Sequence, residues 1–393
     1  VLKPATLRLL LGIAVSHSWP LHQIDISNAF LHGTLQEEVY MQQPTGFVDP
    51  DRPDHVCRLR KSIYGLRQAP RAWFTCLSQA IRSNSGVLQQ LLLHLRSKFS
   101  LRDLGRLSYF LRLEVHYTSD GLILNQRKYI LELLDRSGMS HSNSITTPCT
   151  ADQLIQSASD VSPAFHDPSF YRSIVGGLQY LSFTRPDISF AVNHVSQFQQ
   201  CPTDAHWTAV KRILRYLQGT LTQGLIFQRS SRPQLHGYSD ASFASCPRDR
   251  KSISGYAVFY GKNLVSWSTR KQQAVARSST ECEYRALATV ASEVVWLQAL
   301  LSELGQSTSA PVLWCDNLGA TYLAHNPVFH SRSKHLEIEF HFVRDRVNKQ
   351  QLHVRYLPAT DQLADVLTKP LSRLPFRTFC SKFHLVEVPL AGA

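Results

Sequence analysis

Hydrophobic and polar residues alternate along three short segments in the C-terminal half of the chain. Alternation with a period of two is typical of strands that bury one face. The segments span residues 235–243, 252–260 and 263–271, and turns are expected between them at 246–251 and 260–263. Three strands joined by such short connections predict an antiparallel meander.

Helical periodicity follows the meander. Leucine and valine recur every three or four positions from Leu287 to Leu304, which predicts a long helix over residues 279–304. The pattern then predicts a strand at 312–316, helices at 318–325 and 334–347, a strand at 351–357 and a closing helix after 360. Three antiparallel strands followed by this alternation favour a five-stranded mixed sheet with flanking helices.

The first half of the chain has shorter periodic segments. A helix is expected within residues 1–20, and Asp25 lies in a strand-like alternation just after it. The apolar face of that helix consists of Leu7, Leu10, Leu11 and Ala14. Farther along, the sequence predicts a strand and a helix within 121–139, a polar linker at 144–167, and helices within 169–198 and 206–220.

Composition narrows the class of protein. A chain of 393 residues is expected to form two or three domains, and its net charge of +13 favours a polyanionic partner, nucleic acid before anionic membrane. The alternative is a basic protein without such a partner. Eight cysteines without a Cys-x-x-Cys pair indicate neither a zinc knuckle nor a disulfide framework. No segment has the length of a membrane span, so we expect an intracellular location, cytoplasmic or nuclear. The start at Val1 suggests a fragment.

Four acids stand at the ends or edges of predicted elements. Asp240 ends the first strand of the meander, Glu283 lies near the start of the long helix, and Asp316 ends the next strand; Asp365 follows in the closing segment. Carboxylates that converge in one site repel one another unless a divalent cation lies between them. The sequence therefore suggests a metal-dependent nuclease site.

The long helix offers two glutamates, and its apolar stripe separates them. Glu283 precedes Leu287 by four residues, so it shares the inward face. Glu281 lies three residues after Ser278, in the spacing of a capping box. We therefore expect Glu283 to be the ligand and Glu281 to cap the helix.

The other acids also have structural interpretations. Asp240 could form the turn that follows its strand, and Asp316 could be the N-cap of the next helix. Asp361 suits the cap of the closing helix, while Asp365 would lie one turn inside it. The residues alone leave these alternatives open.

Longer motifs resemble a known family. Residues 37–74, with QPTGF and SIYGLRQAPRAW, are similar to the reverse transcriptase of copia-type retrotransposons. The motifs SDAS, SSTECEYRAL, LWCDNLGA and QLADVLTKPL resemble the RNase H domain of the same Pol polyproteins. The resemblance implies an α/β and α+β multidomain chain. It would hold a truncated reverse-transcriptase palm within 1–143, a linker and helical thumb or connection at 144–231, and an RNase H-like domain at 232–393.

In the polymerase part the resemblance makes Asp25 one of three metal-binding carboxylates. The family's hairpin with two adjacent aspartates is missing, since the chain contains no Asp-Asp pair and is interrupted near residues 82–84. We therefore expect no DNA polymerisation. The gap is either a real deletion or a gene-model artefact. The sequence does not indicate which segments of a polyprotein would precede it. Charge and stacking predict nucleic-acid contacts by Arg60, Lys61, Arg67 and Arg71.

In the RNase H part the resemblance makes Asp240, Glu283, Asp316 and Asp365 the catalytic acids. They would hold two Mg²⁺ or Mn²⁺ ions and cleave the RNA strand of an RNA–DNA hybrid. Phosphates of the nucleic-acid backbone would contact Arg270, Lys271, Arg277 and Ser278. The alternative is a non-catalytic nucleic-acid binder or a decayed transposon remnant, and the oligomeric state stays open.

Overall fold

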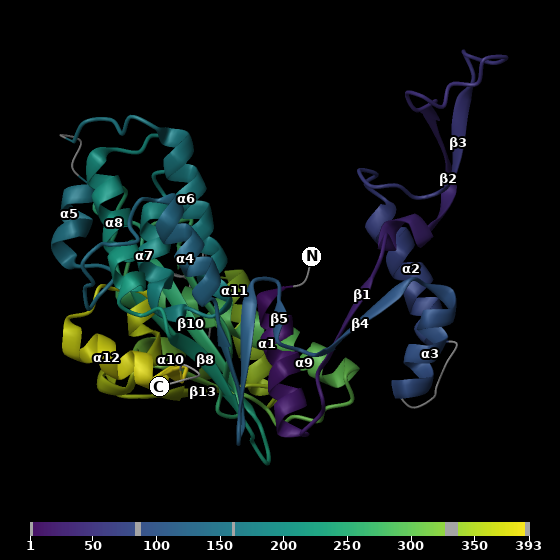
Figure 1. Ribbon diagram of the computed structural model, residues 1–393. Coiled ribbons are helices and arrows are strands. Elements are labelled where there is room, and N and C mark those ends of the chain that lie inside the picture. The colour runs from purple at the N-terminus through teal and green to yellow at the C-terminus, as the bar shows by residue number, and fades with distance from the viewer. Residues whose placement is uncertain (1–2, 83–87, 159–161, 327–336, 390–393) are drawn as a thin grey trace. The chain divides into compact units, whose positions relative to one another are not determined.

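The chain folds into two compact units in a computed structural model that describes residues 3–82, 88–158, 162–326 and 337–389 (Figure 1). The larger unit comprises residues 1–19 and 108–393, and the smaller unit comprises residues 20–107. The domain boundaries expected near residues 143 and 231 both fall inside the larger unit, so that three-part division stays a prediction. None of the described helices has the length and apolar character required to span a membrane.

The smaller unit contains two two-stranded sheets. Strand β1 (His22–Ile26) pairs antiparallel with β4 (Leu101–Arg106), and β2 (Thr34–Gln42) pairs antiparallel with β3 (Val56–Lys61). A short 3₁₀ turn η1 (Ala29–His32) and helices α2 (Ala69–Arg82) and α3 (Leu88–Lys98) complete it. Its core is small and consists of Ala80, Leu95 and Phe99, with Trp73 packed edge-on against Phe99. The predicted interruption near 82–84 adjoins residues 83–87, which lie outside the described residues.

The larger unit contains an antiparallel sheet covered by helices. Its strand order is β14-β8-β7-β6-β5, so the last strand of the chain lies beside a strand from its middle. The strands are β5 (Tyr109–Phe110), β6 (Leu113–Thr118), β7 (Gly121–Asn125), β8 (Gln223–Gln228) and β14 (Leu385–Glu387). The helices are α4 (Arg127–Arg136), α5 (Ala151–Ala158), α6 (Pro168–Tyr180), α7 (Ser189–Ser196) and α8 (Asp204–Gln218), with 3₁₀ turns η2 (Leu181–Phe183) and η3 (Pro186–Ile188).

The segment predicted as a linker contains α5. Asp152 in its first turn interacts favourably with the positive end of the helix dipole, and the helix packs against α8. The expectation of a linker or long loop over all of residues 144–167 is therefore wrong. The polar composition of the segment gives no indication of the packing between α5 and α8.

A second sheet of the larger unit has the strand order β11-β10-β9-β12-β13. The predicted meander is confirmed by the antiparallel pairing of β9 (Leu235–Ser242), β10 (Ile253–Tyr260) and β11 (Asn263–Lys271). Strands β12 (Val312–Cys315) and β13 (His353–Tyr356) extend the sheet in parallel to β9. The later helices are α9 (Ser279–Glu303), α10 (Leu318–His325), α11 (Glu337–Asn348) and α12 (Arg373–Lys382).

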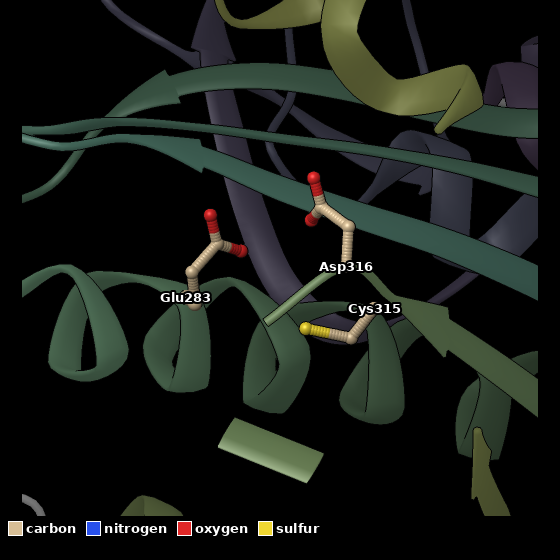
Figure 2. Close-up of side chains that lie close together, drawn as sticks. All are labelled: Glu283, Cys315 and Asp316. Carbon is tan, nitrogen blue, oxygen red and sulfur yellow. The ribbon is translucent and has the colours of Figure 1, made fainter. Parts of the chain in front are cut away.

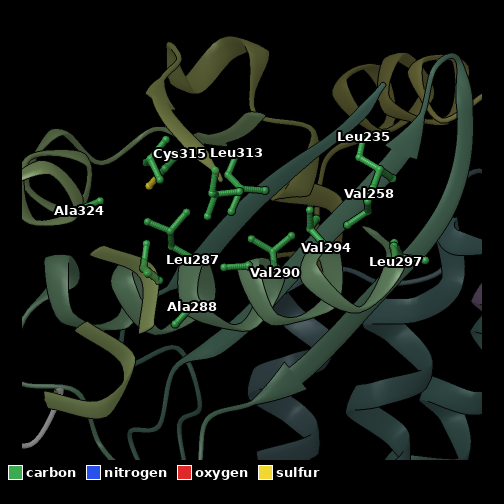
Figure 3. Packing of buried hydrophobic residues seen from close by; sticks show 14 of the residues in the cluster. Leu235, Val258, Leu287, Ala288, Val290, Val294, Leu297, Leu313, Cys315 and Ala324 are labelled. Atoms are coloured by element: carbon green, nitrogen blue, oxygen red, sulfur yellow. The ribbon is translucent and has the colours of Figure 1, made fainter. Parts of the chain in front are cut away.

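The core of this part of the larger unit lies between α9 and the second sheet (Figure 3). The apolar stripe of α9 is buried as predicted from Leu287 to Leu301, but Leu304 at the C-cap is 40% exposed. Residues from all five strands of the sheet belong to the same cluster. Among them are Leu235 on β9, Val258 on β10, Val265 on β11, Leu313 on β12 and Val354 on β13.

Helix α1 (Pro4–Ser16) adds Leu9 and Ile13 to the same core. The predicted apolar face is wrong in part, because Leu10 is 39% exposed. The burial of Arg8 explains the difference: its guanidinium donates to the carbonyl oxygens of Val265, Ser182 and Phe183 at 2.8, 3.0 and 3.1 Å. Helix α1 is thus oriented by a polar anchor as well as by its leucines.

The predicted closing helix is wrong for residues 361–367, which include Asp365. That segment forms two 3₁₀ turns, η5 (Ala359–Asp361) and η6 (Leu363–Leu367), and an α-helix begins only at Arg373. Pro370 has no backbone N–H and would clash with the preceding turn, so a helix cannot continue through it. The acid-bearing segment is therefore compact and held by side-chain contacts.

Candidate metal centre

Three carboxylates from separate elements of the larger unit converge. One oxygen each of Asp240, Asp316 and Asp365 lies within 4.8 Å of the others. Strands β9 and β12 are parallel, and Ser239 is the register partner of Cys315. The next residues along the two strands, Asp240 and Asp316, therefore meet at one edge of the sheet.

Asp365 reaches this edge because η6 packs closely over the sheet. Gly255 on β10 is the register partner of Asp240, and a Cβ placed there would lie only 2.7 Å from the Cβ of Leu367. The hydroxyl of Thr269 on β11 donates to the carbonyl oxygen of Leu367 at 2.9 Å. A glycine in the central strands and a hydroxyl on the edge strand thus position the turn that carries the acid.

Glu283 contributes a fourth carboxylate from the first turns of α9. Its side chain and that of Asp316 extend toward the same side in Figure 2, and both belong to a second group of close ligand atoms with Cys315. Glu283 Oε1 accepts a hydrogen bond from the backbone N–H of Ala241 at 3.2 Å. Its Oε2 is buried and makes no hydrogen bond within the described part of the chain.

Cys315 is poorly suited to bind a divalent metal ion. Burial raises the pKa of its thiol, so the thiol keeps its proton. The backbone N–H of Asn317 donates to Sγ at 3.5 Å, and the side chain is fully buried in the α9 core. The group that can hold a hard divalent cation is therefore the carboxylate set, since Mg²⁺ and Mn²⁺ prefer oxygen ligands.

The electrostatics of the acids reflect their crowding. Burial, followed by the charges of Asp240 and Asp316, raises the pKa of Glu283 to about 10. Burial and then Asp240 raise the pKa of Asp365 to about 6. The pKa of Asp240 is also raised, first by burial. Without a cation Glu283 thus keeps its proton at neutral pH, and a bound cation would release it.

Three side chains of the segment around η6 donate to the acids, and sequence analysis did not single them out. Gln362 Nε2 donates to Asp316 Oδ1 at 3.1 Å. The hydroxyl of Thr368 donates to Asp240 Oδ2, and the ammonium of Lys369 lies 2.9 Å from Asp365 Oδ1. All three belong to the motif QLADVLTKPL, but polar residues in a short loop carry no periodic signal that would separate them from solvent-facing neighbours.

Hydrogen bonds at the start of α9 show which residues cap the helix. Ser278 is the N-cap of α9 as predicted, and it accepts from the N–H of Glu281 at 3.2 Å. The reciprocal bond of Glu281 goes to the N–H of Arg277 at 2.8 Å, one residue earlier than a capping box requires. Glu281 also pairs with Arg285 at 2.8 Å. Glu281 thus serves the helix start, while Glu283 faces the other acids.

Asp316 and Asp361 do not cap helices. Asn317 is the N-cap of α10 and accepts from the N–H of Ala320 at 2.9 Å, so the capping interpretation of Asp316 is wrong. At η6 the cap is the Gln362 side chain. Asp361 instead lies 3.7 Å from Lys382 at the surface. Asp316 is therefore directed at the acids, and Asp361 is not part of the site.

The basic residues predicted to contact nucleic acid are exposed, with one exception. In the larger unit Arg270, Arg277 and Ser278 are exposed, whereas Lys271 is partly buried and paired with Asp249 at 3.0 Å. In the smaller unit all four predicted contacts are exposed, namely Arg60, Lys61, Arg67 and Arg71. Their contacts with nucleic acid stay predictions.

Asp25 lies on β1 of the smaller unit and is exposed. Its register partner on β4 is Arg102. Within the described residues it belongs to no group of three close metal-ligating side chains. The two halves of the site prediction therefore differ: the acids of the larger unit lie together, whereas Asp25 stands apart from any such group.

Comparison with known proteins shows the family. Residues 1–84 match the family model described as reverse transcriptase (RNA-dependent DNA polymerase). The retrovirus-related Pol polyprotein from transposon RE2 of Arabidopsis thaliana is 46% identical over 427 residues, covering 99% of this chain and 29% of that protein. A putative transposon Ty5-1 protein of Saccharomyces cerevisiae is 30% identical, with 66% of this chain and 97% of that protein covered. This chain belongs to the copia-type retrotransposon Pol family.

The chain matches only part of the length of the Pol polyproteins. It also shares 34% identity with the Pol polyprotein from transposon TNT 1-94 of Nicotiana tabacum, over 96% of this chain and 32% of the relative. It thus spans about a third of the length of these polyproteins. The RE2 alignment covers 427 residues, more than the 393 of this chain, so the relative has residues without a counterpart here.

Two solved structures match the chain at low sequence identity. A foamy viral protease-reverse transcriptase in complex with dsDNA matches 84% of this chain and 70% of its own, with 12% identity and a TM-score of 0.47. The N-terminal RNase H domain of rv2228c from Mycobacterium tuberculosis, fused to maltose binding protein, matches 38% of this chain and 97% of its own, with 12% identity and a TM-score of 0.27.

Proposed function

We propose that the larger unit is a divalent-metal-dependent ribonuclease that cleaves the RNA strand of an RNA–DNA hybrid. The observation that carries the proposal is the convergence of Asp240, Asp316 and Asp365 within 4.8 Å, with Glu283 beside Asp316. The carboxylates of Asp240, Glu283 and Asp365 are buried and have raised pKa values, and so close an approach of acids is unfavourable without a cation. Sites of this kind are more often functional than structural.

The residues present fit Mg²⁺ or Mn²⁺. Asp240, Glu283, Asp316 and Asp365 would hold the metal through oxygen, and the buried Glu283 Oε2 makes no hydrogen bond within the described residues. Bound by these residues, such ions would supply Lewis-acid chemistry, namely activation of a water and stabilisation of the charge that develops at the scissile phosphate. Either metal satisfies this argument equally.

The chain's own side chains would orient the acids. Thr368 restricts the rotation of the Asp240 carboxylate, and the Ala241 N–H fixes one oxygen of Glu283. Lys369 provides a positive charge beside Asp365, and its side chain is 45% exposed. It can therefore also face a phosphate that approaches from solvent. These contacts would hold the carboxylates in one arrangement before substrate arrives.

The substrate class is inferred from charge and from the family. The exposed Arg270 and Arg277 would contact phosphates, which position a duplex without reading its sequence. A hybrid would be chosen by its groove shape and by the 2′ hydroxyls of the RNA strand. We propose that Lys271 contributes less than the sequence suggests, because Asp249 already neutralises it.

The smaller unit would not polymerise DNA. Within the described residues Asp25 belongs to no cluster of metal-ligating side chains, and a two-metal polymerase requires several carboxylates around the 3′ hydroxyl. We expect a primer-extension assay with the full chain to give no incorporation above a no-enzyme control. Processive, metal-dependent incorporation would refute this part of the proposal.

A second candidate function is nucleic-acid binding without catalysis. The exposed arginines of the smaller unit and the net charge of +13 favour it. Binding through phosphates weakens steeply with salt for either function, so a salt titration does not separate them. Cleavage does separate them.

The deciding experiment is hybrid cleavage by the full chain, with Mg²⁺ and with EDTA. We expect cleavage of the RNA strand only with metal, and its loss in Asp240→Asn and Asp316→Asn. Asp361→Asn is a matched control, because Asp361 lies in the same segment as Asp365 but pairs with Lys382 instead. Cleavage that persists in EDTA or in both site variants would refute the ribonuclease. Binding without any cleavage would favour the second function.

A further inference from the structure

One buried amide connects three of the segments that carry the acids. Gln362 is fully buried, three residues before Asp365. Its Nε2 donates to the carbonyl oxygen of Ser239 at 2.8 Å and to Asp316 Oδ1 at 3.1 Å. Its Oε1 accepts from the N–H of Ala364 at 3.1 Å. Both amide hydrogens and the oxygen are therefore used.

We infer that Gln362 is a positioning residue for the metal centre, an inference that rests on the proposed function. Ser239 immediately precedes Asp240 on β9, and Ala364 immediately precedes Asp365 in η6. By its three bonds Gln362 fixes the strand of the first acid, the carboxylate of Asp316 and the turn that carries Asp365. A change in its side chain would shift these groups relative to one another.

The chemistry of an amide suits this position. A neutral donor orients Asp316 through Oδ1 but leaves its negative charge available to a cation. An ammonium or guanidinium in the same place would compete with the metal for that charge. Partners that orient metal ligands in this way typically change metal affinity by about 10-fold to 100-fold when they are removed.

Gln272 provides a matched comparison within the larger unit. Its Nε2 also makes two hydrogen bonds, to Ser254 Oγ at 2.7 Å and to the carbonyl oxygen of Cys282 at 2.9 Å. These bonds connect the end of β11 to β10 and α9 and involve no carboxylate. Replacing either glutamine by methionine removes an amide of similar size, but only Gln362→Met removes a contact to an acid.

The test is a calorimetric titration of the full chain with Mn²⁺ alone. It compares the wild type with Gln362→Met and Gln272→Met. Each variant is first shown to be folded by near-ultraviolet circular dichroism. We expect the dissociation constant to rise at least about 10-fold in Gln362→Met and clearly less in Gln272→Met, because Gln272 reaches the carbonyl of the residue before Glu283 but no carboxylate. The Mg²⁺ concentration for half-maximal cleavage should rise in parallel, while the rate at saturating metal changes less.

Several results would overturn the inference. A folded Gln362→Met with wild-type Mn²⁺ affinity removes the positioning role but leaves the ribonuclease intact. A wild-type chain that binds no Mn²⁺ overturns the metal centre and this inference together. If Gln362→Met does not fold, Gln362→Asn decides, because its shorter amide cannot span the same three partners. Failure of both to fold would mean that the residue maintains the fold rather than the ligand geometry.

Discussion

Replacing Asp365 by asparagine should stabilise the metal-free protein. Burial and the charge of Asp240 raise the pKa of Asp365 from 3.8 to about 6. This shift of about two pH units corresponds to roughly 3 kcal/mol at 1.36 kcal/mol per unit. The figure already includes the favourable effect of Lys369, and the Asp365 side chain is only 12% exposed. The wild-type chain is destabilised by about this amount when the carboxylate is charged.

The sign of the pH dependence follows from the raised pKa. Below about pH 3 the carboxyl is mostly protonated in both folded and unfolded chains, so it contributes almost no penalty. As the pH rises through 4 to 6, the unfolded chain loses its proton first and the wild-type protein loses stability. The advantage of Asp365→Asn should therefore be below about 1 kcal/mol at pH 4 and complete above about pH 7.

The assay is urea unfolding in EDTA at pH 4 and pH 7.5, repeated at pH 7.5 with Mg²⁺. Metal should reverse the order, because only the wild-type site keeps all its acids. Asp361→Asn, at the surface beside Lys382, should change stability by less than about 1 kcal/mol at either pH. An Asp365→Asn protein that is less stable than wild type in EDTA at pH 7.5 would refute the repulsion argument.

Three further predictions concern other groups of the larger unit. Lys369→Met removes the ammonium that lies 2.9 Å from Asp365 and competes with a cation for its charge, so Mn²⁺ should bind a few-fold more tightly in calorimetry. Weaker Mn²⁺ binding by this variant would show that the ammonium does not compete with the metal. Arg8→Met leaves three carbonyl oxygens without their donor and should lower the free energy of unfolding by about 3 kcal/mol in urea titrations; an unchanged value would refute the anchor. Because burial raises the pKa of Glu283 to about 10, Mn²⁺ affinity should increase from pH 6 to pH 9, and Glu283→Gln should flatten that profile.

The periodic elements could be predicted from the sequence because periodicity is a local property. The alternation over residues 235–271 became β9, β10 and β11, and the stripe that begins at Leu287 became the buried face of α9. Predictions failed where a tertiary partner or a proline decided the outcome. Arg8 orients α1 by bonds to distant carbonyls, and a helix cannot run on through Pro370, so the closing helix begins only at Arg373.

The candidate acids could be named from their places at element ends and from the family motifs, but their environment could not. Gln362 lies 46 residues from its partner Asp316, and Thr368 lies 128 residues from Asp240. Neither has a helical or strand period that would indicate its partner. Only the parallel pairing of β9 with β12 and the close packing of η6 brought these groups together.

The sequence by itself determined the strongly periodic strands and helices, which residue types are available for metal chemistry, and the family, but not helix α5 or the turns η5 and η6. The tertiary structure alone decided which of the acids share a site, which are used at helix starts, and which neutral and positive side chains control them. The physical reason is the distance along the chain over which each effect acts. The conformational preference of the backbone acts over a few residues. The desolvation and repulsion of buried carboxylates depend instead on elements that come together only when the chain folds.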